Sequence, residues 1–308
     1  MSQFFSAARR LLALLAVAAV LGQPPAFGWG DSGHMLINRV AVQKLPATMP
    51  AFLRQAVDRI QYLGPEPDRW RERSELALKA AQEPDHFIDL ERVSWMEKFP
   101  PTRYEFYRAL YDRRAQAKEN ADDLLPERVG LQPYITMEIY DRLKVAFREY
   151  RRLQAEKKPT QAVEQNIVFY AGWLGHYVAD AAQPLHTTIH FNGWVGDNPN
   201  AYTTARDFHG KFEATFVNDN LARLPIADLV TPPVRLQDPF ADYIRFLRQS
   251  HALVEKTYQL DKAGGFAGAG TPESIEFVRR RMAAGCQMLL NLWYTAWLES
   301  EKPVPRPS

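Results

Sequence analysis

The chain has 308 residues, 46% of them hydrophobic and 24% charged, and its formal net charge is +2. This near-neutral balance excludes an overall positive potential that would attract nucleic acid, although it does not exclude a local basic patch. The one cysteine, Cys286, excludes an intrachain disulfide, and its position before an apolar stretch predicts a buried, unreactive thiol.

The first segment of the chain is typical of a secretory signal peptide. A basic pair precedes an apolar run over 11–21, and the small residues Ala26 and Gly28 occupy the positions that signal cleavage requires. We therefore expect a signal peptide over residues 1–28, cleavage before Trp29, and export to the periplasm or the extracellular space. An uncleaved anchor is the alternative, but the apolar run is too short for a comfortable membrane span.

The rest of the chain is long enough for one large domain. Removal of the leader takes away two of the 38 basic residues and none of the 36 acidic ones, which leaves a formal balance of zero. We expect a single domain over 29–302, a poorly ordered proline-rich tail over 303–308, a monomer, and no stable membrane insertion.

Helical periodicity dominates this region, so the fold class that we predict is all-α, a single multi-helical domain. Thr160 and Thr271 are candidate helix N-caps, and Pro272 occupies the first helical position after the second of them. The glycine-rich segment 264–270 is predicted to be a loop, and Arg279–Arg281 a solvated helix face. Apolar residues recur at three- and four-residue spacing over 45–63, 134–153, 160–182, 207–221, 239–260 and 272–298.

Histidine and acidic residues recur at spacings that suit a metal centre. His176 and Asp180 are four residues apart, so they share one face of the predicted helix, and Pro184 then turns the chain before His186. Imidazole and carboxylate are zinc ligands, and more than four of them indicate more than one ion. The candidate ligand side chains are His34, Asp68, His86, His176, Asp180, His186, His209 and Glu213. The α-amino group of Trp29, once freed by cleavage, is a further candidate.

Taken in order, these motifs resemble the superfamily of trinuclear zinc phosphodiesterases that holds the bacterial phospholipases C and the single-strand-specific zinc nucleases. The resemblance runs from Trp29 to Glu213 and extends to the terminal helix that ends at Trp297. It implies the all-α fold of that superfamily with a three-zinc cleft, and it implies the following ligand sets. The first zinc takes Asp68, His86, His176 and Asp180; the second takes His186, His209 and Glu213; the third takes the amino and carbonyl groups of Trp29, His34 and a shared oxygen of Asp180.

The same resemblance implies a catalytic role for Asp68, Arg71 and Asp180. A hydroxide between two zinc ions attacks phosphorus, with Asp68 as an orienting base, Arg71 on the phosphate and Asp180 as the bridge between two ions. Phe87 and Asp89 match positions that stack on and hydrogen-bond a nucleobase in the nucleases, although Phe87 is equally compatible with a core position. Structural zinc without turnover is the alternative, but three side chains at the second site leave a position open.

The substrate class is divided between two branches of the superfamily. Glu213 is similar to the phospholipases, whereas the string from His86 to Asp89 and the Asp68–Arg71 pair are more similar to the nucleases. An uncharged Ser32, where phospholipases place an acid for the choline head group, also favours the nucleases. We therefore expect an exported nuclease or 3′-nucleotidase that acts on single-stranded DNA or RNA, with a phospholipase C as the alternative and a non-catalytic zinc protein as a distant third. His190 is interpreted as a surface or supporting residue and His251 as structural.

Overall fold

The computed structural model describes residues 29–301. The predicted signal peptide over 1–28 and the predicted tail over 303–308 lie outside the described residues. Within the described part of the chain, no helix combines the length and the apolar character that a bilayer span requires.

The all-α prediction is confirmed, because residues 29–301 form helices and no strand. The longer helices are α2 (Gly30–Gln43), α7 (Arg103–Gln116), α9 (Gln132–Ala155), α10 (Gln161–Ala182), α13 (Pro239–His251), α14 (Val254–Lys262) and α15 (Pro272–Glu299). The shorter ones are α3 (Ala51–Gln55), α4 (Val57–Tyr62), α5 (Glu66–Arg69), α6 (Leu76–Gln82), α8 (Pro126–Val129), α11 (Phe208–Gly210) and α12 (Phe216–Asn220). Single turns are 3-10 helical in η1 (Glu83–His86), η2 (Leu90–Val93), η3 (Ala121–Leu124), η4 (Pro184–Thr187), η6 (Leu221–Arg223) and η7 (Ala227–Leu229), and π-helical in η5 (Lys211–Thr215).

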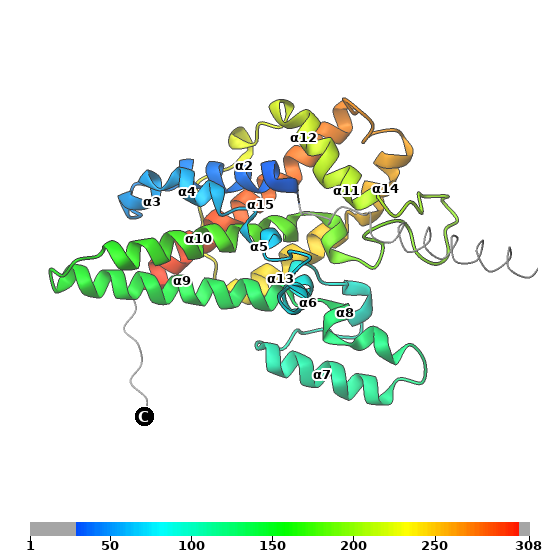
Figure 1. Ribbon diagram of the computed structural model, residues 1–308, viewed down its shortest axis with the longest axis horizontal. Helices are drawn as coiled ribbons and strands as arrows, with labels where there is room; N and C mark the ends of the chain where they lie inside the picture. The colour runs from blue at the N-terminus through cyan, green and yellow to red at the C-terminus, as the bar shows by residue number, and fades with distance from the viewer. Residues whose placement is uncertain (1–28, 302–308) are drawn as a thin grey trace, which may run out of the picture.

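Helix α10 is the centre of the fold. It packs against α9, α15, α2, α4 and α13, and α7 lies in a lobe apart from this bundle (Figure 1). From Ala171 to Ala182 every α10 side chain except Trp173 is buried, and most are small or apolar. A helix that is buried on all sides belongs to the core, so His176 and Asp180 are ionisable groups in the least hydrated element of the fold.

Two glycines allow neighbouring helices to approach α10 closely. A Cβ on Gly175 would lie 1.8 Å from Asn38 Oδ1 of α2, and a Cβ on Gly172 would lie 2.4 Å from Leu63 Cβ. The Asn38 amide uses this proximity, because it donates hydrogen bonds to the carbonyls of Gly172 (3.1 Å) and Ile60 (2.9 Å). The contact places α2, which carries His34 one turn earlier, directly against the histidine of α10.

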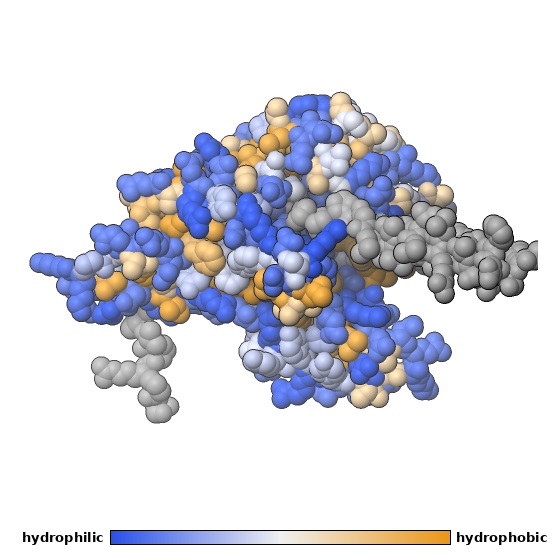
Figure 2. Space-filling view, in the orientation of Figure 1, coloured by the Kyte–Doolittle hydropathy of each residue, from blue (hydrophilic) through white to orange (hydrophobic). Residues whose placement is uncertain are grey.

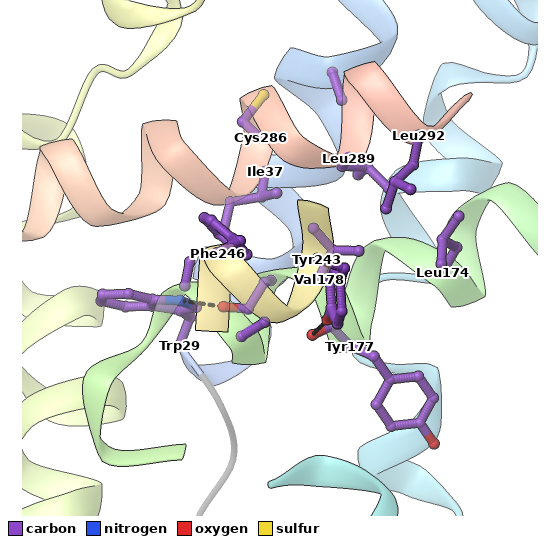
Figure 3. Packing of buried hydrophobic residues seen from close by; sticks show 14 of the residues in the cluster. Trp29, Ile37, Leu174, Tyr177, Val178, Tyr243, Phe246, Cys286, Leu289 and Leu292 are labelled. Atoms are coloured by element: carbon purple, nitrogen blue, oxygen red, sulfur yellow. Dashed lines mark hydrogen bonds between the residues drawn. The ribbon is translucent and has the colours of Figure 1, made fainter. Parts of the chain in front are cut away.

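The start of the described chain is anchored in the core. The Trp29 side chain is fully buried, and its indole N–H donates to the carbonyl of Ala179 at 2.8 Å, drawn as a dashed line in Figure 3. Val178 and Tyr243 belong to the same buried cluster (Figure 3). The surface in Figure 2, by contrast, is mainly hydrophilic with small hydrophobic patches.

Several predicted helix boundaries are wrong. The periodic segment 45–63 is not one helix, because α3 begins only after Pro50 and ends before Ala56. The segment 239–260 likewise forms two helices, α13 and α14. Thr271 caps α15 as predicted, with its side chain accepting from the Ser274 N–H in a reciprocal capping box, whereas the Thr160 side chain makes no cap hydrogen bond.

The prediction for the basic run on α15 is also wrong at one position. Arg281 is only 9% exposed, and its guanidinium donates to the Ala182 carbonyl (2.8 Å) and to Ser250 Oγ (2.8 Å). It thereby satisfies a backbone carbonyl at the C-terminal end of α10, where a cation is favoured. Cys286 is fully buried as predicted, and burial raises the pKa of its thiol to about 12.

Candidate metal centre

The first group of candidate ligands lies where α5 and η1 meet α10. His86 Nδ1 lies 3.2 Å from Asp180 Oδ2 and 3.7 Å from Asp68 Oδ1. His176 Nε2 lies 3.0 Å from His86 Nδ1, 3.3 Å from Asp180 Oδ2 and 3.9 Å from Asp68 Oδ1. All four side chains are at most 3% exposed, so the sequence-predicted ligand set for the first ion converges on one buried point.

The second group lies where η4 meets the π-helical turn η5. His209 Nε2 is 2.7 Å from Glu213 Oε2, and His186 Nε2 is 3.2 Å from the same oxygen and 3.2 Å from His209 Nε2. The π-helical turn follows His209 and contains Glu213, so it distorts the helix predicted over 207–221 at this group, and such turns are frequent at functional sites.

The third group places α2 beside α10. His34 Nε2 lies 3.4 Å from Asp180 Oδ1, and the His34 and His176 rings stack with centroids 4.2 Å apart. Asp180 therefore presents one oxygen to His34 and the other to His86 and His176. This arrangement of its two oxygens is what a carboxylate needs in order to serve two neighbouring ions.

Hydrogen bonds to backbone carbonyls orient three of the imidazoles. His176 Nδ1 donates to Gly64 (2.8 Å), His186 Nδ1 to His86 (2.7 Å) and His209 Nδ1 to Phe191 (3.1 Å). Because only an N–H donates to a carbonyl, the neutral rings of all three direct the lone pair of Nε2 toward the carboxylates. Lone pairs and carboxylates that face one another repel unless a proton or a metal cation lies between them. A backbone carbonyl that accepts from the other ring nitrogen is typical of metal-binding histidine.

Unpartnered buried atoms test whether zinc fits these groups. Both ring nitrogens of His34, Asp68 Oδ2, Asp180 Oδ1 and Glu213 Oε1 are buried and lack a hydrogen-bond partner among the described residues. Zinc bonds of about 2.1 Å at tetrahedral angles separate neighbouring ligand atoms by about 3.4 Å. The separations of 2.7–3.9 Å within the first two groups fall around this value, so the donor set fits zinc.

The pKa shifts show the strength of the field in this region. Burial raises the pKa of Asp68, although His176 and Arg71 act against it. Burial likewise opposes ionisation of Asp180, but His176 and His186 outweigh it and hold the pKa of Asp180 well below its usual value. Burial lowers the pKa of His186, yet Asp180 and Glu213 together raise it to about 9. The carboxylates therefore attract positive charge into the site, and metal ions would supply it.

A cleft of about 420 Å³ opens onto these groups. Its lining includes His86, His186 and His209 from the metal groups, together with the predicted substrate residues Arg71, Phe87 and Asp89. Arg71 Nη1 donates to Asp68 Oδ1 at 3.0 Å. Asp89 is not a free carboxylate, because Arg92 Nε donates to its Oδ2 at 2.9 Å, and burial raises its pKa to about 7. Phe87 is only half-buried, so it is not simply a core residue.

Gln183 is a supporting residue that we did not predict from the sequence. Its fully buried amide donates to Glu213 Oε2 at 2.9 Å and accepts from the Leu185 N–H at 2.5 Å. It therefore joins a ligand on η5 to the turn that carries His186. The available signal was the position of Gln183 directly before Pro184, at an N-cap where a side-chain acceptor is expected.

Replacement of Gln183 by methionine should weaken zinc at the second group about 10- to 100-fold, because Glu213 loses the donor that orients it. Zinc affinity would be measured by competition with a chelator. Gln132→Met is the matched control, since Gln132 is equally buried and donates instead to the Tyr177 carbonyl (2.5 Å). Equal zinc affinity in the Gln183 variant and the wild type would contradict this role.

The chain terminus allows a second prediction. Trp29 is held beside Asp180 through the Ala179 carbonyl, and its own carbonyl accepts from the Gly33 N–H at 3.2 Å. A protein that begins at Trp29 should hold three zinc ions, and one that retains Gly28 should hold two, because the α-amino ligand is then an amide. Metal analysis of the two proteins is the measurement, and three ions in both would exclude the α-amino group as a ligand.

The two remaining histidines differ in their surroundings. His190 stacks on Trp194 with centroids 4.0 Å apart and accepts from the Val195 N–H through Nδ1, so it organises the loop after η4. His251 Nδ1 donates to the Thr187 carbonyl at 2.9 Å. Neither belongs to a metal group among the described residues.

No protein-family model and no curated protein matches the chain. One solved structure that it resembles is the alpha-toxin of Clostridium perfringens from an avian strain, at 14% sequence identity and a TM-score of 0.44. The likeness covers 90% of this chain but only 65% of the toxin chain. This likeness assigns no role to any residue, so the roles of the site residues are inferred from the geometry of this chain alone.

Proposed function

We propose that this chain is a zinc-dependent phosphodiesterase that acts on single-stranded nucleic acid or 3′-nucleotides. The observation that carries the proposal is the convergence of five histidines and three carboxylates beside an open cleft, whose lining includes His86, His186 and His209. A purely structural zinc site is usually closed by four ligands and needs no cleft, whereas the second group has three side chains, of which His186 and His209 line the cleft.

Zinc bound at such a centre activates water near neutral pH and offsets the negative charge of a phosphate ester. Asp68, held by Arg71, has a raised pKa and a buried Oδ2, which suits the acceptor of a proton from the attacking water. Arg71 lines the cleft and offers a planar guanidinium to phosphate oxygens. Asp180 links the first and third groups, because one of its oxygens faces His34 and the other faces His86 and His176.

Phe87 and Asp89 supply the contacts expected for a base. The Phe87 ring is partly exposed in the cleft and can stack on any nucleobase. Asp89 lines the cleft beside Phe87, and its carboxylate oxygens can accept a hydrogen bond from the polar edge of a base.

A phospholipase C is the second candidate, favoured by one feature of the cleft. Glu127 lines it without an ion-pair partner among the described residues, next to the apolar Leu185 and Phe191. A carboxylate beside apolar side chains suits a cationic lipid head group.

A substrate panel separates the candidates. Zinc-loaded protein that degrades single-stranded DNA or RNA supports the nuclease, and protein that releases only a phosphorylated head group from lipid supports the phospholipase. A chain that holds zinc fully and hydrolyses neither substrate would be a non-catalytic zinc protein, and the proposal would be withdrawn.

A further inference from the structure

A second groove lies beside the metal cleft. This outer groove has a volume of about 880 Å³ and runs between α7, the segment 117–124 and the loop after η4. Phe191 lines both the outer groove and the cleft. The Asp89–Arg92 ion pair also spans them, since Asp89 faces the cleft and Arg92 faces the groove. The groove therefore borders the cleft along Phe191 and the Asp89–Arg92 ion pair.

The outer groove has an excess of unpaired positive charge. Within residues 29–301, the exposed side chains of Arg113, Lys118 and Arg206 have no carboxylate at ion-pair distance, and all three line the groove. Of the three acids that line it, Asp123 pairs with an arginine, whereas Glu91 and Glu119 have no lysine or arginine at ion-pair distance in the same range.

The other charged groups in the groove already have partners. Asp123 lies 2.6 Å from Arg92, and Glu91 accepts from the Thr188 hydroxyl and from the Ile189 N–H. Three unpaired cations against two carboxylates that no lysine or arginine neutralises, Glu91 and Glu119, leave a small excess of positive charge, which favours an anionic ligand.

Two exposed aromatic rings line the groove together with these cations. Trp95 is 37% exposed and Phe191 is 48% exposed, so parts of both rings are open to a ligand. The indole N–H of Trp95 is used by the Arg92 carbonyl at 3.1 Å, and the Arg113 guanidinium lies 5.5 Å from the Trp95 ring. A flat ring beside a cation binds a base and its phosphate together.

The charge pattern distinguishes between two possible occupants. An acyl chain in this groove would bury apolar surface against seven ionisable side chains, which costs free energy for each one that loses water. A polynucleotide presents phosphates to the cations and bases to the rings, and it keeps both hydrated at the edges.

We propose that the outer groove binds the part of a single-stranded polynucleotide that extends beyond the scissile phosphate. The proposal rests on the proposed nuclease function and adds to it, because it predicts a preference for long strands over dinucleotides. Bases would stack on Phe191 and Trp95, and Arg113, Lys118 and Arg206 would contact successive phosphates.

The test compares a long substrate with a short one. Trp95→Ala and the combined Arg113→Gln, Lys118→Gln, Arg206→Gln variant should lower kcat/KM about tenfold for an oligonucleotide of about 20 nucleotides. Both should leave kcat/KM for a dinucleotide unchanged, and the triple variant should also flatten the salt dependence. Tyr104→Ala is the matched control, because Tyr104 is an exposed aromatic residue of α7 that does not line the groove.

A binding measurement separates this inference from the proposed function. Anisotropy of a labelled phosphorothioate oligonucleotide reports affinity without cleavage. If the oligonucleotide binds and the groove variants weaken its binding, but the protein cleaves no nucleic acid, the groove proposal stands and the proposed nuclease function is wrong. Cleavage of both substrates with unchanged affinity and kcat/KM in the variants would overturn the groove alone. Absence of both oligonucleotide binding and cleavage would also overturn the groove proposal. So would a Trp95→Ala variant that loses binding to phosphatidylcholine vesicles and not to the oligonucleotide.

Discussion

Asp180→Asn should remove two zinc ions together and lower phosphodiester hydrolysis by about 10³-fold, since each ion supplies several kcal/mol of charge stabilisation. The two Asp180 oxygens face different partners, His34 at 3.4 Å and His86 at 3.2 Å. An amide keeps the shape of the side chain but places an N–H where a ligand lone pair is needed. Zinc per chain and kcat/KM are the two measurements.

Asp85→Asn is the matched control for this variant. Asp85 is a buried aspartate one residue before His86, but it pairs with Arg103 at 3.3 Å and belongs to no metal group. The control should retain all three ions. Loss of a single ion from the Asp180 variant would contradict the bridging role of this carboxylate.

The ligands on one continuous element could be predicted because their spacing is local. His176 and Asp180 follow from a four-residue separation on a helix, and the proline before His186 signals the turn that redirects the chain. Their approach to His34 could not be predicted from spacing. It depends on the contact of Asn38 with Gly172 and Gly175, and a buried polar residue packed on two glycines has no periodic signature.

The missed elements have equally physical reasons. Helix α7 buries only Phe106 and Leu110 among 14 residues, so its sequence shows almost no apolar stripe. Helix α2 has two glycines among its first four residues, which lower helix propensity, and its polar His34 and Asn38 are buried. Arg281 was predicted to be solvated because a charge is rarely buried, and only the end of α10 explains its position.

The outer groove was beyond the reach of sequence patterns for a different reason. Trp95, Phe191 and Arg206 lie in irregular segments, where no period relates one side chain to the next. Their grouping depends on how the lobe of α7 and the loop after η4 pack, which is a tertiary property.

Removal of zinc by a chelator should lower the Tm of the protein by more than about 10 °C. Each of three ions, at a free concentration 100 times its Kd, contributes about 2.7 kcal/mol to the free energy of unfolding. A loss of 1 kcal/mol lowers the Tm of a large domain by about 2–4 °C. Without the ions, Asp68, Asp180 and Glu213 are buried negative charges. The positive charge that then faces them comes from the Arg71 guanidinium and from any imidazole that binds a second proton. Zn²⁺ should restore the Tm and Mg²⁺ should not, because imidazole nitrogen is a poor ligand for magnesium. Calorimetry with zinc-saturated chelator as the control is the measurement. An unchanged Tm in protein shown to be zinc-free would mean that these eight side chains are stable without metal, and the assignment of the centre would then be wrong.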